Sequence, residues 1–178
     1  YYLYKLSGGY TTFNDGIRRF HNKEDKKGFV VDKDTVAIVR GSVTRKDSWM
    51  DLISMLEKDG VCIANSRQCV SVCTDKYRTF LRLADYGVPQ PRTILINDPE
   101  NLQKSVEELD TKFPIILKTL RGSKGVGVLF VESEKSLDSI VQLIHKQDED
   151  ADLLLQEYHK IDYDCLLYTS DAADDRDS

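Results

Sequence analysis

The sequence predicts an α/β fold: a parallel-sheet N-terminal domain, followed by a subdomain of antiparallel strands and helices. The first sign is a strand–helix–strand order, in which two short apolar runs at residues 35–39 and 61–64 flank a helical pattern. The second is a glycine-rich segment, residues 121–127, between two further predicted strands. The third is a last apolar strand at residues 153–158.

The composition is that of a globular protein with a core of its own. The 178 residues are 40% hydrophobic and 31% charged, and the formal net charge of −5 argues against a surface that coats nucleic acid. We see no apolar run of membrane-spanning length and no signal-peptide pattern, so we expect a cytoplasmic protein without a membrane partner. The four cysteines form no CxxC pair, and we expect buried free thiols.

The first part of the chain alternates between clear and weak patterns. A helix is expected near residues 13–20, followed by a charged turn and the strand at 35–39. Asp47 or Ser48 then caps a helix that Gly60 ends, before the strand at 61–64. The apolar residues of that helix recur at helical spacing: Trp49, Leu52, Ile53 and Leu56.

The second part predicts alternating helices and strands. A helix over residues 75–86 stops at Gly87, and Pro89 and Pro91 impose an extended connector. Further strands are expected at residues 94–96, 113–118, 126–132 and 153–158. Further helices are expected at residues 99–109, opened by Asp98-Pro99, and at 136–146.

The glycine-rich segment between two strands has two interpretations. It is neither a Walker A loop nor a Rossmann fingerprint, because the lysine–serine ending is absent and no helix follows. It could be a hairpin whose glycines supply positive φ angles. It could also fold over a polyphosphate through its backbone N–H groups, with Arg121 and Lys124 adding complementary charge.

Two lysines stand at positions that an anion would explain. Lys118 ends an apolar strand, where a buried ammonium needs an anionic partner, although strand alternation could equally place it on the solvent face. Lys76 stands at a helix start, which is a poor place for a cation unless an anion binds there. A solvated lysine paired with a nearby acid is the alternative for Lys76.

Five segments in this order resemble the ATP-grasp superfamily, and most of all its RimK-like glutamate ligases, with glutathione synthetases as cousins. The resemblance covers roughly residues 34–164. The segments that carry it are Cys73-Thr74-Asp75-Lys76, Gly87-Val88-Pro89-Gln90-Pro91, Phe113-Pro114-Ile115-Ile116-Leu117-Lys118, the glycine-rich segment and Gln156-Glu157-Tyr158. The implied fold is a pre-ATP-grasp domain, then an ATP-grasp lid subdomain, with most of the second ATP-grasp subdomain missing.

The resemblance also implies site residues. Lys76 and Lys118 match the two lysines that contact the phosphates of ATP. Arg40 matches an arginine near the substrate side, or is a solvated arginine at a strand end. The flexible loop over the nucleotide matches Gly122, Ser123, Lys124, Gly125 and Gly127. The hinge strand, whose backbone binds the adenine edge, matches Gln156, Glu157 and Tyr158, and Asp164 follows near the ribose.

The implied chemistry is ATP-dependent amide formation with Mg²⁺. A carboxylate attacks the γ-phosphate to give an acylphosphate, and an amine then displaces phosphate. We expect a ligase that adds glutamate or a similar amino acid to a protein or peptide. A ligase making a small peptide of the glutathione type, or a nucleotide-binding module without catalysis, are the alternatives, and self-association stays open.

The end of the chain has an unusual pattern. Residues 165–174 can be encoded as TGTCTCTTATACACATCTGACGCTGCCGAC, which resembles a transposon-derived sequencing adapter. A genuine acidic tail is the alternative. We therefore expect a pre-ATP-grasp domain at residues 1–72, a truncated ATP-grasp domain at 73–164 and a non-native tail at 165–178. The metal ligands and catalytic residues of relatives would lie beyond Asp164.

Overall fold

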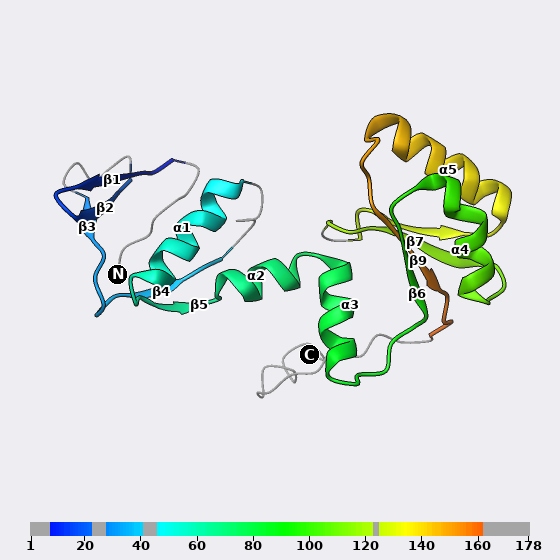
Figure 1. Ribbon diagram of the computed structural model, residues 1–178, viewed down its shortest axis with the longest axis horizontal. Coiled ribbons are helices and arrows are strands. Elements are labelled where there is room, and N and C mark those ends of the chain that lie inside the picture. Colours follow the sequence, from blue (N-terminus) through cyan, green and yellow to red (C-terminus); the bar gives the residue numbers. More distant parts are fainter. Residues whose placement is uncertain (1–7, 23–27, 41–45, 123–124, 162–178) are drawn as a thin grey trace, which may run out of the picture. The chain divides into compact units, whose positions relative to one another are not determined.

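The computed structural model describes residues 8–22, 28–40, 46–122 and 125–161, and it has the α/β class that the sequence predicts (Figure 1). The chain forms two compact units. The first comprises Tyr1–Gln90 with Thr119–Gly127, and the second comprises Pro91–Lys118 with Val128–Ser178. Within the described ranges, no helix has the length and apolar character needed to cross a membrane.

The first unit opens with an antiparallel sheet where we expected a helix at residues 13–20. Strands β1 (Tyr10–Asn14), β2 (Ile17–His21) and β3 (Phe29–Val30) pair in the order β1-β2-β3. The helix prediction is wrong because Asp15-Gly16 forms a tight turn, with φ angles of 53° and 73°. Two positive φ angles at the centre of a two-residue loop are the requirement of a type I′ hairpin, which Asp-Gly satisfies.

The predicted strand–helix–strand unit is confirmed. Strands β4 (Val36–Ile38) and β5 (Cys62–Ala64) are parallel, with Ala37 opposite Ile63, and helix α1 (Asp47–Lys58) connects them. The helix buries one face, with Met50, Ile53 and Leu56 as its buried residues. The apolar periodicity therefore corresponds to the packing of α1 against the strands.

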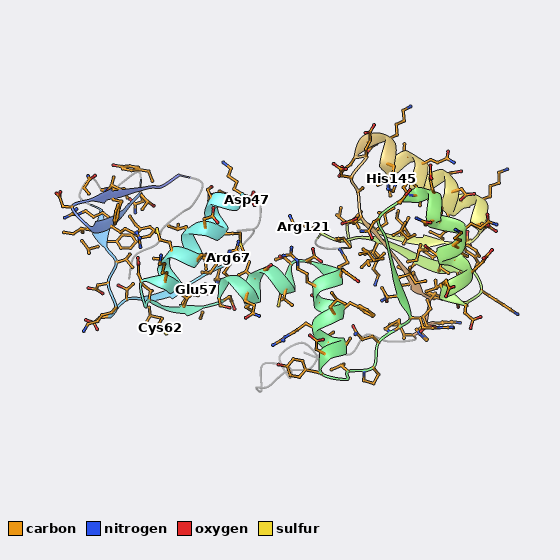
Figure 2. The ribbon with its side chains drawn as sticks, in the orientation of Figure 1. Asp47, Glu57, Cys62, Arg67, Arg121 and His145 are labelled. Atoms are coloured by element: carbon orange, nitrogen blue, oxygen red, sulfur yellow. The ribbon has the colours of Figure 1, made fainter. Side chains whose placement is uncertain are left out.

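Two helices complete the first unit. Helix α2 (Arg67–Cys73), which the sequence reading missed, is capped by Ser66 and held by the Glu57 carboxylate, which accepts the Arg67 N–H at 2.9 Å (Figure 2). Helix α3 (Lys76–Asp85) has Asp75 as its N-cap. Gly87 follows with a φ of 66°, as the predicted stop requires.

The described cysteines are free but not buried, so that expectation is wrong. Cys62, Cys69 and Cys73 are all exposed. Strand alternation turns Ile63 toward α1 and Cys62 away from it, while helix α2 buries only Val70. A cysteine on β5 or α2 is therefore not necessarily buried, because each of these elements packs against the rest of the unit on only one side.

The second unit is built on a four-stranded sheet with the strand order β6-β9-β7-β8. Strands β6 (Thr93–Ile96) and β9 (Leu153–Glu157) are antiparallel, as are β7 (Ile115–Thr119) and β8 (Val128–Val131). The glycine-rich segment joins β7 to β8, so the prediction of a turn between antiparallel strands is confirmed.

Helices cover one face of this sheet (Figure 1). The predicted helix at 99–109 is a 3₁₀ turn, η2 (Pro99–Asn101), capped by Asp98 and continued by α4 (Leu102–Leu109). Helix α5 (Glu134–Gln147) is the second predicted helix. The core between helices and sheet consists of Ile96, Leu102, Leu109, Ile115, Leu117, Val131, Leu137, Val141, Leu153 and Leu155.

Replacing Leu155 by alanine tests this core. Leu155 is 0% exposed, so Leu155→Ala removes buried methyl groups and leaves a cavity, and we expect a loss of about 2–5 kcal/mol of unfolding free energy. Leu143 on α5 is 58% exposed and serves as the control, for which we expect a change within about 0.5 kcal/mol. Urea unfolding measures both, and equal losses would contradict the assigned packing.

Candidate functional site

A row of polar side chains crosses the sheet of the second unit on the face opposite the helices. Strand alternation turns Leu117 into the core and Lys118 to the other face. The Lys118 ammonium donates a hydrogen bond to the side-chain oxygen of Gln156, and the Gln156 amide donates to Thr93 Oγ1 at 2.8 Å. The row therefore runs across β7, β9 and β6, and its cation contacts an amide oxygen where we expected an anion or solvent.

Aromatic side chains lie beside this row. Phe130 is paired with Ile116, and Val128 with Lys118, so all four side chains share one face of the sheet. Phe130 and Tyr158 meet edge to face, with ring centroids 5.0 Å apart, and both side chains are exposed. The face thus presents a cation next to an exposed apolar surface on which a planar ring can lie.

In the first unit, Lys76 begins α3 and binds the glycine-rich segment. Its backbone N–H donates to the Leu120 carbonyl and its ammonium to the Thr119 carbonyl, both at 2.9 Å. Asp75 accepts the N–H groups of Tyr77 and Arg78, each at 3.0 Å. The first-turn N–H groups are thus engaged within the chain, and the ammonium is a group that this helix end can offer to an anion.

Burial of Lys76 also weakens its hold on its proton. Desolvation lowers the pKa of the ammonium, and the charge of Asp75 opposes the shift. The ammonium thus lies in a less solvated place than an ordinary surface lysine.

The glycine-rich segment needs glycine for close approach as well as for conformation. A Cβ on Gly122 would lie 2.3 Å from the Val126 carbonyl oxygen and 3.5 Å from Lys76 Nζ. Gly125 and Gly127 both have φ angles of 78°. Arg121, labelled in Figure 2, lies with its Nε 3.9 Å from an Asp75 carboxylate oxygen.

The carboxylate of Glu157, a residue predicted for the hinge, forms hydrogen bonds within the chain. The carboxylate accepts hydrogen bonds from the Arg92 backbone N–H at 2.7 Å and from Arg92 Nε at 3.0 Å, and His159 Nε2 lies 3.0 Å away. The Arg92 N–H, then His159 and the Arg92 guanidinium, lower the pKa of Glu157 to about 2. The sequence reading missed Arg92 and Thr93, because their roles depend on the β6–β9 register.

Of the other predicted site residues, none that the structure describes lies in the polar row on the sheet or beside Lys76. Arg40 is exposed, two residues past the end of β4. Ser123, Lys124, Asp164 and residues 165–178 lie outside the described residues. Across the ranges that the structure describes, no three His, Cys, Asp or Glu side chains gather into a metal-binding group.

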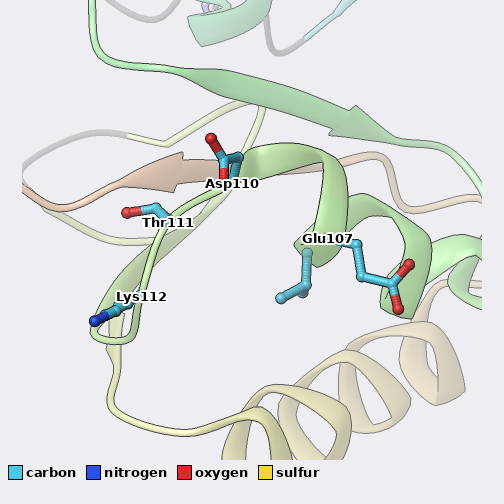
Figure 3. Close-up of a pocket in the computed structure, with 5 residues that line it drawn as sticks. Glu107, Asp110, Thr111 and Lys112 are labelled. Atoms are coloured by element: carbon cyan, nitrogen blue, oxygen red, sulfur yellow. The ribbon is translucent and has the colours of Figure 1, made fainter.

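A shallow hollow in the second unit lies away from the predicted residues (Figure 3). Its lining comes from the end of α4 and the following turn: Val106, Glu107, Asp110, Thr111 and Lys112. It contains none of the predicted site residues. The open face of the sheet therefore remains the stronger candidate.

The glycine-rich turn between the antiparallel strands β7 and β8 agrees with the predicted ATP-grasp fold, and comparison with known proteins identifies the family. The family model of the RimK-like ATP-grasp domain matches residues 73–167, so the chain belongs to this family. It is 32% identical over 128 residues to beta-citrylglutamate synthase B of Danio rerio, covering 70% of this chain and 31% of that protein. It is 31% identical over 128 residues to N-acetylaspartylglutamate synthase A of Mus musculus, covering 70% and 33%.

A solved structure supports the fold. The RimK domain ATP-grasp protein of Sphaerobacter thermophilus superposes with a TM-score of 0.59 at 20% sequence identity. The match covers 72% of this chain and 47% of that one. The chain spans about a third of the length of the curated relatives it matches.

Gly127→Ala and Gly125→Ala test the close packing at the base of the glycine-rich segment. The two glycines share a φ of 78°, so each alanine carries the left-handed cost of about 1–2 kcal/mol. A Cβ on Gly127 would also lie 2.1 Å from Thr119 Oγ1, whereas one on Gly125 meets no described atom within 4 Å. We expect the larger loss of unfolding free energy for Gly127→Ala, with partial recovery on adding Thr119→Ala. Equal losses in urea unfolding would contradict this packing.

The depressed pKa of Glu157 predicts a pH-dependent contribution to stability. The carboxyl ionises at about 2 in the fold and at 4.5 in the reference state, so its contribution is complete above pH 4.5. It is lost as the pH falls from 4.5 through 2. We expect the stability difference between the unaltered chain and Glu157→Gln to shrink as the pH falls below 4.5. A difference that is flat down to pH 2 in urea unfolding would contradict the bonds to Arg92.

Proposed function

We propose that this chain is the nucleotide-binding part of an ATP-dependent carbon–nitrogen ligase that joins glutamate or a similar amino acid to a carboxylate. The observation that carries the proposal is the row of Lys118, Gln156 and Thr93 on the sheet face that the helices leave open. Membership of the RimK-like ATP-grasp family supports the same conclusion. Both point to a bound nucleotide with its phosphates at lysine side chains.

Each predicted residue has a part in this proposal. Lys118 and Lys76 bind phosphate oxygens as point charges, exchanging their present partners, Gln156 and the Thr119 carbonyl, for the ligand. The adenine lies by Phe130 and Tyr158, with its edge at the backbone of Glu157 and Tyr158. The nucleotide-covering loop comprises Gly122, Ser123, Lys124, Gly125 and Gly127. Asp164 serves the ribose, and Arg40 serves the substrate side.

The proposed reaction has two steps. A substrate carboxylate attacks the γ-phosphorus of ATP, forming an acylphosphate and releasing ADP. The amine of the amino acid then attacks the acyl carbon, forming the amide, losing a proton and releasing phosphate. The lysines hold the polyphosphate in line and offset its charge. When bound, Mg²⁺ offsets further phosphate charge, but the described residues do not provide a ligand set, and we assign no step to it.

The acceptor is either a protein or peptide end, or a small carboxylate. The resemblance to glutamate ligases that the sequence shows favours a protein or peptide. Two relatives bear the names beta-citrylglutamate synthase and N-acetylaspartylglutamate synthase, which favour glutamate transfer to a small carboxylate as the second candidate. A nucleotide-binding module without catalysis is the remaining alternative.

The cellular location and the domain boundaries of the ligase are also part of the proposal. We place it in the cytoplasm, with a pre-ATP-grasp domain over residues 1–72 and the ATP-grasp domain from residue 73. Three described cysteines that are free rather than paired agree with a reducing compartment. The family match, which begins at residue 73, agrees with the domain boundary.

An assay of ADP release by the full-length ligase tests the function. The ligase is incubated with Mg·ATP, glutamate and one carboxylate at a time: citrate, N-acetylaspartate, or a peptide ending in glutamate. We expect ADP release that depends on both the carboxylate and glutamate, with a mass increase of the acceptor by one glutamyl residue. Nucleotide binding without turnover with any acceptor would support the non-catalytic alternative, and no nucleotide binding would overturn the proposal.

Lys118→Ala and Lys124→Ala test the placement of the phosphates. Lys118 is held on a strand by Gln156, so it loses little further side-chain freedom on engaging a ligand, whereas ordering a lysine that has no such contact costs about 1.5–2 kcal/mol. We expect Lys118→Ala to weaken Mg·ATP binding by the full-length ligase by about tenfold or more, and Lys124→Ala by less than about threefold. Equal effects in a calorimetric titration would count against Lys118.

A further inference from the structure

Arg92 stands just before β6 and joins the ends of three elements. Its backbone N–H and its Nε donate to the two carboxylate oxygens of Glu157, at 2.7 Å and 3.0 Å, at the end of β9. Its Nη1 donates to Asp110 Oδ2 at 3.2 Å, at the C-terminal end of α4. One side chain thus ties the first strand of the second unit to its last strand and to a helix end.

The bond to Glu157 also ends the β6–β9 ladder in an irregular way. The pair Arg92 and Glu157 follows Thr93 and Gln156 in the antiparallel register. A regular hydrogen-bonded pair exchanges two backbone bonds. The Glu157 N–H does donate to the Arg92 carbonyl at 3.0 Å, but the Arg92 N–H goes to the Glu157 carboxylate. The Glu157 carbonyl is therefore released from Arg92 at the point where the proposed hinge begins.

We propose that Arg92 is a positioning residue that fixes the Glu157–Tyr158 backbone and thereby sets the preference of the nucleotide site for adenine over guanine. This inference rests on the proposed function. Adenine offers an amino donor at the position where guanine offers a carbonyl acceptor. A backbone carbonyl held at that position accepts from adenine and repels guanine, whereas a peptide free to turn can present its N–H to guanine instead. Selectivity of this kind requires supporting contacts that hold the backbone in place.

The two acidic partners of Arg92 are not equivalent, which provides a matched control. The Glu157 side chain is 15% exposed, whereas that of Asp110 is 91% exposed and its ion pair is screened by water. The Asp110 carboxylate also contacts only the outer end of the guanidinium. Removing it leaves the two bonds to Glu157, so Asp110→Asn removes charge near Arg92 without releasing the hinge.

The test is the ratio of ATP to GTP affinity in the full-length ligase, titrated with Mg·ATP and Mg·GTP. For Arg92→Met we expect weaker ATP binding and unchanged or tighter GTP binding, lowering the ratio by about tenfold, the effect of one or two hydrogen bonds. For Asp110→Asn we expect a ratio within about twofold of the unaltered ligase. Arg92→Lys, which keeps the charge but loses the paired donors, should lie between them.

Other outcomes separate this inference from the proposed function. A parallel loss of ATP and GTP affinity in Arg92→Met, with an unchanged ratio, would show a merely structural role and overturn the inference alone. If the unaltered ligase binds no ATP, the proposed function falls and the inference falls with it. Should Arg92→Met not fold, Glu157→Gln removes the carboxylate charge at the same contact. A lowered ratio there supports the inference, and an unchanged ratio overturns it.

Discussion

The position of β9 between β6 and β7 is the constraint on which the rest of the second unit depends. Its three leucines, Leu153, Leu154 and Leu155, are all buried, and they hold the strand in the middle of the sheet. Burial of three such side chains favours this arrangement by several kcal/mol, on the order of 1.5–3 each. Because β9 is fixed by its leucines, its polar last residues are delivered to a defined place beside β6 and β7.

The alternation of each strand then places core residues on one face and the proposed site residues on the other. On β7, Leu117 packs against α4 and α5, while its neighbour Lys118 faces the other way, to Gln156 of β9. A change of register by one residue would exchange the two faces and bury the lysine. The position of the cation on the open face therefore depends on the packing of the apolar core on the other face.

Local patterns in the sequence were sufficient for most elements, because strand and helix periodicities are local properties. The parallel unit of β4, α1 and β5, the helix start at Asp98, and the antiparallel turn of residues 121–127 were all predicted. The helix at residues 13–20 was wrong although the sequence held the signal against it, since Asp15-Gly16 between alternating residues is typical of a hairpin. Lys118 and Gln156 were predicted separately as site residues.

Pairings between distant residues could not be predicted from those patterns. The contacts of Lys118 with Gln156 and of Arg92 with Glu157 join residues 38 and 65 positions apart, and they depend on a strand order that no local pattern specifies. Arg92 in particular follows a proline and precedes a strand, and nothing nearby in the sequence marks it as a partner of β9. The prediction that the cysteines are buried was wrong for a related reason. The exposure of β5 and α2 depends on which other elements cover them.

We propose that the face of the β6-β9-β7-β8 sheet opposite α4 and α5 binds a nucleotide. A crystal structure of the full-length ligase with Mg²⁺ and a non-hydrolysable ATP analogue tests it most directly. We expect phosphate oxygens within hydrogen-bonding distance of Lys118 Nζ, and the adenine edge at the backbone of Glu157 and Tyr158. A nucleotide bound on the helix side of the sheet, or with Lys118 still donating to Gln156 and far from every phosphate, would contradict it.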